Sequence, residues 1–313
     1  MSQARLTRIS SGPARPSRVI AVFAYNEAGR IQAALGRIAG AAGGEEVDVY
    51  VLANGCTDTT SEAVKASGSL VPNLCLVEID LADKANAWNI FVHEVFSARR
   101  AEEITTYFFT DGDVVLEPGA LPALALALAE VPGTQAAGGM PATGRDRDAW
   151  RERMVINGRL AGNLYALRGS FVQRLRDRDV RMPVGLIGED VFVSWLVETD
   201  IGRRDRPGVE PACVFSTGAL FSFRSLSLWR WRDYRTFLRR KWRYTVRGLQ
   251  HQMLVLFLVE NGLGAMPASV EQLYASGPLP SRLRWVGIDT PMRLVAMLWI
   301  RSHRRQAVRG RGG

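Results

Sequence analysis

The sequence predicts an α/β fold in which helices cover both faces of a mostly parallel β-sheet. Three observations support this prediction. Short β-branched runs alternate with helical patterns in the first part of the chain, as they do in successive βαβ units. The runs are apolar at adjacent positions, as expected for strands that are buried on both faces. Polar motifs follow the ends of these runs, which is where parallel sheets bind their ligands.

Each of the first four predicted strands is followed by a helical pattern. The strands are predicted at 17–25, 46–53, 74–79 and 105–110. The helical patterns begin near residues 27, 57, 84 and 118. Beyond residue 130 the pattern loosens, and further strands are predicted at 136–140, 162–169 and 211–217. An apolar helical run is expected to begin at 188–190, and the C-terminal third reads as helical and basic.

Length and composition favour one large domain with an appendage. The chain has 313 residues, of which 47% are hydrophobic and 23% charged, and these values are typical of globular proteins. Its three cysteines lie far apart, which argues against a disulfide framework or a structural zinc site. No apolar run is long enough to span a membrane, and the N-terminus lacks the apolar core of a secretory signal. We therefore expect a cytoplasmic protein with a flexible basic lead-in at 1–17, a main domain at 18–223 and a basic helical region at 224–313.

The net charge of +9 is unevenly distributed. Residues 224–250 contain nine Lys and Arg against one acidic residue, and residues 281–313 contain eight Arg against one acidic residue. These segments carry +8 and +7, so the rest of the chain carries −6. An asymmetry of this kind indicates an anionic partner for the C-terminal region rather than for the whole protein.

The stretch TDGD places two carboxylates, Asp111 and Asp113, directly after a predicted strand. Asp-Gly-Asp is common in turns, and alone it is more often a turn than a site. However, Mg²⁺ and Mn²⁺ prefer oxygen ligands, and Mg²⁺ commonly takes one or two carboxylates together with substrate phosphates. Gly112 allows the backbone to turn so that both side chains can face one cleft.

The other polar motifs also have a simple structural interpretation. Glu189 and Asp190 at a helix start would cap the helix and interact favourably with its dipole. Lys84 would lie on a solvated helix face, and Asn54 would belong to a turn. The order of these motifs, each at the carboxyl end of a strand or the start of a helix in one α/β chain, favours a common site instead.

With these motifs in order, the chain resembles a family 2 glycosyltransferase with the GT-A fold. The resemblance covers roughly residues 18–200 and rests on five segments: VFAYNEAGRI, VLANGCTDTTSEAV, DKANAWNIFV, FFTDGDVVLEPGAL and MPVGLIGEDVFVSWLV. The fourth segment is similar to the family's D-x-D motif, and the fifth to its acceptor-side Glu-Asp motif. The first departs from the family's pattern, because Ala24 stands where a proline is usual.

The resemblance implies an inverting transfer of a sugar from a nucleotide-diphosphate sugar to an acceptor hydroxyl. Asp190 would be the general base, with Glu189 beside it to position the acceptor. Asp113, with Asp111, would hold a divalent metal, either Mg²⁺ or Mn²⁺. The residues implied to contact the nucleotide and its diphosphate are Asn26, Glu27, Asn54, Asp58, Lys84 and Asp111.

One position departs from the family's pattern in a way that concerns the donor. An aspartate in the second loop commonly contacts uracil, and this chain has Ala53 there. Either the neighbouring Asn54 serves as a neutral partner, or the base is not uracil. The nucleotide of the donor is therefore left open.

The basic C-terminal region contains four arginines at strict i, i+4 spacing, namely Arg235, Arg239, Arg243 and Arg247. Like charges at this spacing destabilise an isolated helix by roughly 0.2–0.5 kcal/mol per pair, so an anion or the acidic body is expected to compensate. Three interpretations remain: a helix packed on the catalytic domain, a helix on the surface of an anionic membrane, and a cover over the donor diphosphate. A lipid-linked acceptor, or another sugar or hydroxyl acceptor near the inner face of the cell membrane, would suit the last two.

Two other functions are alternatives to glycosyl transfer. A nucleotidyltransferase would need a Gly-rich, basic first loop, and AYNEAGRI does not provide one. A nucleic-acid-binding protein is suggested by the isoelectric point near 10 and the interleaved Trp and Arg. The acidic body and the ordered carboxylates argue against that function, so no nucleic-acid partner is expected.

Overall fold

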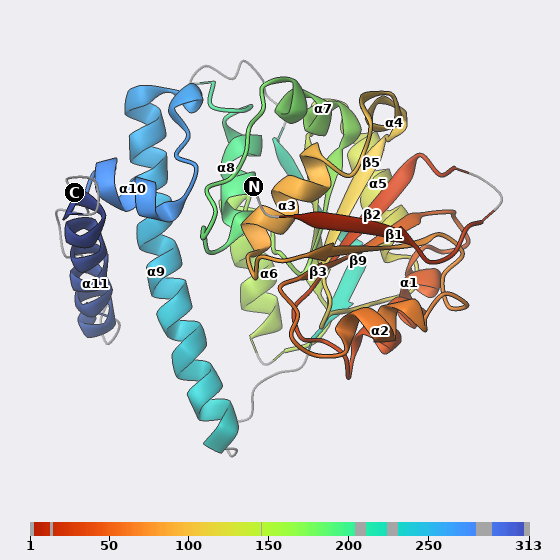
Figure 1. Cartoon of the computed structure of the whole chain (residues 1–313). Helices are drawn as coiled ribbons and strands as arrows, with labels where there is room; N and C mark the ends of the chain where they lie inside the picture. The colour runs from red at the N-terminus through yellow and green to blue at the C-terminus, as the bar shows by residue number, and fades with distance from the viewer. Residues whose placement is uncertain are drawn as a thin grey trace.

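The computed structural model describes residues 3–12, 15–144, 146–203, 211–223, 231–279 and 290–309. These residues form a nine-stranded sheet with helices on both faces, and a group of helices from the C-terminal region lies beside it (Figure 1). The strand order across the sheet is β1-β4-β3-β2-β5-β8-β7-β9-β6. The α/β class predicted from the sequence is confirmed.

The elements are bounded as follows. The strands are β1 (Ala4–Arg8), β2 (Arg18–Ala24), β3 (Asp48–Asn54), β4 (Leu74–Ile79), β5 (Thr106–Asp111), β6 (Val115–Leu116), β7 (Ala136–Pro141), β8 (Leu164–Arg168) and β9 (Cys213–Ser222). The helices of the main domain are α1 (Ile31–Ala41), α2 (Thr60–Lys65), α3 (Lys84–His93), α4 (Ala98–Glu103), α5 (Ala120–Glu130), α6 (Arg147–Asn157), α7 (Gly169–Asp177) and α8 (Glu189–Glu198). The C-terminal helices are α9 (Trp231–Asn261), a 3₁₀ turn (Leu263–Ala265), α10 (Val270–Ser276) and α11 (Thr290–Arg309).

The parallel part of the sheet is β4-β3-β2-β5, built from the first four predicted strands. Their carboxyl ends therefore lie along one edge, and the polar motifs follow them there. β8 is antiparallel to both β5 and β7, so the second half of the sheet is mixed. The loop that follows β5 thus lies at the border between the parallel and the mixed halves.

The N-terminal lead-in differs from the prediction. Ala4–Arg8 is not a flexible segment but forms β1, an edge strand antiparallel to β4. Arg5 forms an ion pair with Glu78 of β4 at 2.6 Å, and the backbone of Ile9 donates a hydrogen bond to Leu74. Four of its five residues, Leu6 among them, are exposed, as expected for a short basic edge strand.

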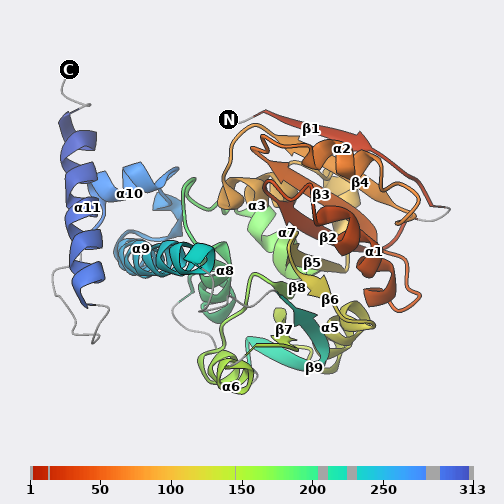
Figure 2. The same cartoon turned by 90° about the horizontal axis from the view of Figure 1, so that it is seen from below.

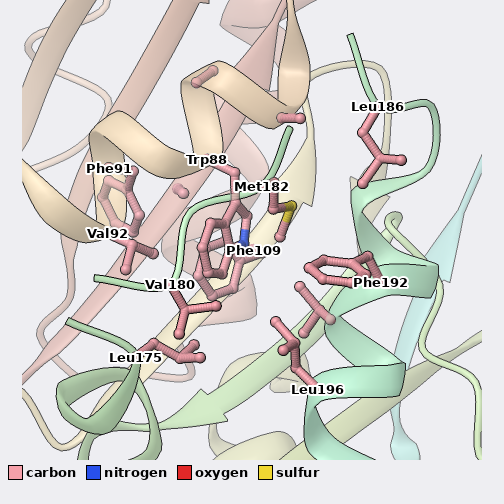
Figure 3. Close-up of a cluster of buried hydrophobic side chains, with 14 of the residues drawn as sticks. Trp88, Phe91, Val92, Phe109, Leu175, Val180, Met182, Leu186, Phe192 and Leu196 are labelled. Atoms are coloured by element: carbon pink, nitrogen blue, oxygen red, sulfur yellow. The ribbon is translucent and has the colours of Figure 1, made fainter. Parts of the chain in front are cut away.

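Each face of the sheet has its own hydrophobic core. Phe108 belongs to the core beneath α1, α2 and α5, whereas Phe109 belongs to the core beneath α3, α7 and α8. Both side chains are fully buried, because adjacent residues of a strand point to opposite faces. Figure 3 shows the second core, where Trp88, Phe109 and Phe192 pack together from α3, β5 and α8. The aromatic run before Asp111 is therefore an interior strand, as predicted.

The C-terminal helices contact the domain through the middle of α9 and the start of α10. Val246, Leu249, Met253 and Leu254 are buried and belong to the same core as Trp88 and Phe192. By contrast, every residue from 234 to 240 is exposed, and this end of α9 extends past the domain (Figure 1). In Figure 2, α9 is seen nearly along its axis and α11 runs across it on the side away from the sheet. Within the described ranges, no helix combines the length and apolarity needed to cross a membrane.

Candidate active site

The loops after β2 and β3 are tied together by the polar side chains that the sequence singled out. Asn26 has a left-handed backbone (φ 55°), and its side-chain Oδ1 accepts a hydrogen bond from the backbone of Thr57 at 2.8 Å. The backbone N–H of Glu27 donates to the hydroxyl of Thr60 at 2.8 Å. Asp58 accepts from the same hydroxyl at 2.5 Å, and this hydrogen bond is the main cause that lowers the pKa of Asp58.

Asn54 is placed differently from its neighbours. Its side chain is buried, and with the amide nitrogen turned toward the carbonyls it donates to Ala24 at 2.8 Å and to Leu52 at 3.2 Å. Asn54 therefore links the ends of β2 and β3. Its contact with a nucleotide base stays a prediction.

The Asp-Gly-Asp turn ends β5 at the centre of this edge. The backbone of Gly112 donates to the carbonyl of Phe23 at 2.7 Å, and a Cβ at this position would lie 2.9 Å from the same oxygen. Only glycine allows this close approach to the end of β2 without a shift. The turn leaves the side chain of Asp113 exposed, two residues beyond the end of β5.

Asp113 faces the acidic side of the first loop. Burial raises the pKa of Glu27, and the negative charge of Asp113 raises it further. The charge of Asp58 also raises the pKa of Glu27, whereas Arg30, which pairs with Glu27 at 3.2 Å, lowers it.

Lys84, the first residue of α3, joins two motifs that are far apart in the sequence. Its Nζ lies 2.5 Å from Oδ1 of Asp111 and 2.6 Å from Oε1 of Glu189. Burial alone would lower the pKa of Lys84, but the charges of Asp111 and Glu189 outweigh it and raise the pKa above its ordinary value. Lys84 is therefore a charged residue between two carboxylates and not part of a solvated helix face.

Asp190 is held in a different way from Glu189. Its Oδ2 accepts a hydrogen bond from the backbone of Gly162 at 3.0 Å, and its carbonyl accepts one from the hydroxyl of Ser194 at 2.7 Å. Glu189 is only 4% exposed, whereas Asp190 is half-buried and keeps access to solvent. Asp190 is thus the carboxylate of this pair that solvent reaches.

Several residues of the site were not singled out from the sequence. Gly162 lies against the ion pairs of Lys84, and a Cβ there would be 3.2 Å from both Glu189 Oε1 and Lys84 Nζ. Tyr165 is fully buried, and its hydroxyl accepts a hydrogen bond from the indole nitrogen of Trp88 at 3.1 Å. Asp83 caps α3, since its side chain accepts from the backbone of Asn86 at 2.6 Å. Only Asp83 had a recognisable signal, because an Asp directly before a helical pattern is a common N-cap.

The predicted residues thus fall into two neighbouring groups. One contains Lys84, Asp111, Glu189 and Asp190, linked by the ion pairs of Lys84 and the adjacency of the two acidic residues. The other contains Asn26, Glu27, Asp58 and Asp113 at the ends of β2, β3 and β5. Asp111 and Asp113 belong to one turn and therefore connect the groups.

The arrangement of sheet, turn and flanking helices is the GT-A fold. The structure is similar to the mannosyltransferase PcManGT from Pyrobaculum calidifontis in complex with GDP-Man and Mn²⁺, with a TM-score of 0.54 and 18% identity over 96% of this chain and 76% of that chain. It is also similar to residues 1–349 of S. aureus TarS in complex with UDP-GlcNAc, with a TM-score of 0.50 and 13% identity over 92% of this chain and 88% of that chain. No family model and no curated protein matches the sequence. The GT-A fold expected from the sequence is confirmed.

Proposed function

We propose that the protein is a glycosyltransferase that moves a sugar from a nucleotide-diphosphate sugar to an acceptor hydroxyl with inversion at the anomeric carbon. The observation that carries this proposal is the position of Lys84, which joins Asp111 on the donor side to Glu189 on the acceptor side. The two ion pairs of Lys84 bring the Asp-Gly-Asp motif and the Glu-Asp motif, which are far apart in the sequence, next to each other. The solved structures with this fold support it, because they contain GDP-Man or UDP-GlcNAc.

In the proposed reaction, the acceptor oxygen attacks the anomeric carbon from the side of Asp190. The carboxylate of Asp190 takes the hydroxyl proton while the bond from the sugar to the diphosphate breaks. The transition state has oxocarbenium character, as in other glycosyl transfers. Lys84 offers a positive charge next to Asp111, where the departing diphosphate becomes more negative.

A divalent cation, Mg²⁺ or Mn²⁺, fits the Asp-Gly-Asp turn. Asp113 is exposed, and none of the described residues donates a hydrogen bond to it or pairs with it. Across the ranges that the structure describes, no group of three or more His, Cys, Asp or Glu is arranged to hold a metal alone. We therefore propose that Asp113 and Asp111 hold the cation together with the donor phosphates. When bound, the ion neutralises charge on the leaving diphosphate.

The identity of the donor base is tested by a thermal-shift screen of nucleoside diphosphates with and without Mn²⁺ or Mg²⁺. Ligands that bind the folded state raise its stability, by about 2.7 kcal/mol at a concentration 100 times the Kd. We expect one base to raise the melting temperature more than the others, and only with metal present. Stabilisation by UDP would show that Ala53 does not exclude uracil. If no nucleotide raises the melting temperature, the proposed function is wrong.

We also propose that the basic C-terminal region contacts an anionic membrane, which would suit a lipid-linked acceptor in bacterial-type glycan or glycolipid assembly. The exposed end of α9 presents Tyr234, Phe237 and Leu238 beside Arg235 and Arg239. No carboxylate among the described residues forms an ion pair with these arginines. Aromatic and basic side chains on one exposed helix suit the headgroup region of anionic lipid, where each basic residue contributes about 1 kcal/mol.

Sedimentation with vesicles tests this contact. We expect the protein to bind vesicles that contain phosphatidylserine but not neutral vesicles, and the double variant Arg235→Glu, Arg239→Glu to lose most of the binding. The matched control reverses two exposed arginines elsewhere, Arg37→Glu and Arg99→Glu, and should bind as the unmodified protein does. Equal binding by both double variants would contradict the contact at α9.

A further inference from the structure

The loop from Met182 to Gly188 leads directly into Glu189 and Asp190, so its position decides where both carboxylates lie. On the α3 side, the amide of Asn89 exchanges two hydrogen bonds of 2.8 Å with the backbone of Met182. The free oxygen of the helix cap, Asp83 Oδ2, accepts from the backbone of Gly185 at 2.9 Å. Met182 and Leu186 insert their side chains into the core next to Trp88 and Phe192 (Figure 3).

The opposite side of the same loop is held by α9. Gln250 is only 2% exposed. Its Oε1 accepts from the backbone of Ile187 at 2.9 Å, and its Nε2 donates to the hydroxyl of Tyr274 at 2.7 Å and to the carbonyl of Gly185 at 3.4 Å. Gln250 is therefore a buried amide whose hydrogen bonds fix the last turn of the loop. Such groups are costly to leave without partners.

The next residue of α9 holds the end of the loop. Nε2 of His251 lies 2.9 Å from the carbonyl of Gly188, which is able only to accept a hydrogen bond, so this nitrogen carries the proton. Burial lowers the pKa of His251 to about 4, and the ring is therefore neutral near pH 7. Gly188 has a positive φ of 82°, and a Cβ there would lie 2.2 Å from Cδ of Arg247. The side chain of Arg247 thus covers the residue that immediately precedes Glu189.

A backbone bridge adds to these contacts. The N–H of Val184 donates to Ala268 at 3.0 Å, and the N–H of Val270 donates to Val184 at 2.9 Å. The loop is consequently held between α3 on one side and α9 and α10 on the other. The residues of α9 that hold it lie more than 50 positions beyond Asp190 in the sequence, and none of them belongs to the glycosyltransferase-like segments.

We infer that Gln250 and His251 are positioning residues for the acceptor side of the site, because they hold the loop that places Asp190 and Glu189. This inference rests on the proposed glycosyltransferase function. The middle of α9 is accordingly part of the active-site scaffold. Neither side chain needs to touch a substrate. A displacement of about 1 Å at a catalytic group is sufficient to lower a rate by about 100-fold.

The test compares variants that remove these hydrogen bonds with variants that do not. Gln250→Ala and His251→Leu are expected to lower kcat for transfer by about 10- to 100-fold, while the Kd of the nucleotide with metal changes less than twofold. His251→Gln keeps a donor in reach of Gly188 and should recover most of the rate. Tyr274→Phe removes only one partner of Gln250 and should have a smaller effect. Met253→Ala truncates a buried residue of the same helix and serves as the control for lost stability.

Hydrogen exchange separates this inference from the proposed function. In Gln250→Ala and His251→Leu, the amide of Ile187 and its neighbours in the loop should exchange faster, whereas β2 and β5 should exchange as before. Unchanged exchange in the loop would overturn the inference even if the protein transfers sugar. Equal losses of kcat in Met253→Ala and Gln250→Ala would also overturn it. Absence of transfer by the unmodified protein would instead contradict the proposed function.

Discussion

Replacing Asp190 by asparagine is expected to lower the rate of sugar transfer by about 10²- to 10⁴-fold, the usual contribution of a general base. Asparagine has nearly the same shape, and its side-chain oxygen is able to accept the hydrogen bond that Gly162 donates to Asp190. It has no basic oxygen to take the acceptor proton. The loss should therefore appear in kcat, with little change in nucleotide affinity or melting temperature.

The measurement is the steady-state rate of transfer with the donor found in the nucleotide screen, together with nucleotide binding by calorimetry. Ser194→Ala is a useful companion, because it removes the hydroxyl that donates to the Asp190 carbonyl but leaves the carboxylate in place. We expect a smaller loss of rate for Ser194→Ala than for Asp190→Asn. Turnover of Asp190→Asn within a few-fold of the unmodified protein would exclude Asp190 as the base.

Replacing Asp113 by asparagine is expected to remove most of the metal-dependent activity, with a rate loss of about 100-fold or more, because a catalytic metal contributes several kcal/mol of charge stabilisation. Asp113 is exposed and has no structural hydrogen bonds among the described residues, so the fold should be unaffected. The same change removes one of the negative charges that raise the pKa of Glu27. The mechanism therefore predicts weaker metal binding without lower stability.

A titration of Mn²⁺ in the presence of nucleotide measures this effect directly. The stabilisation that nucleotide confers should depend on metal in the unmodified protein and lose that dependence in Asp113→Asn. Glu130→Gln, an exposed neutralisation at the end of α5, is the matched control and should titrate normally. A normal metal dependence in Asp113→Asn would mean that the cation is held by other groups.

Both predictions depend on residues that were identified from the sequence, and the reason is local. A buried parallel strand has consecutive apolar residues and ends where polar residues begin, so TYFFTD reveals both β5 and the turn that follows it. The same reasoning located β2, β3 and β4 to within two residues at either end. The edge strand β1 was missed, because pairing with β4 stabilises a short basic segment that has little propensity of its own.

The C-terminal region shows the limit of such reasoning. A helical period over 225–250 predicts a helix there, and the structure has α9 at Trp231–Asn261, while residues 225–230 lie outside the described ranges. A period alone does not say what each face of the helix contacts. The structure buries the middle of α9 against the loop before Glu189 and leaves residues 234–240 exposed. Packing on the domain and the proposed contact with an anionic membrane therefore concern different parts of one helix.

The sequence by itself determined the α/β class, the strand ends and the acidic residues that follow them, since these depend on patterns within a few neighbouring positions. Only the tertiary structure decided that Lys84 pairs with both Asp111 and Glu189, that Gly162 lies against them, and that Gln250 and His251 hold the loop before Glu189. The physical reason is that these contacts join residues 27 to more than 100 positions apart. Their geometry depends on how the helices pack on the sheet, so it cannot be predicted from patterns among neighbouring residues.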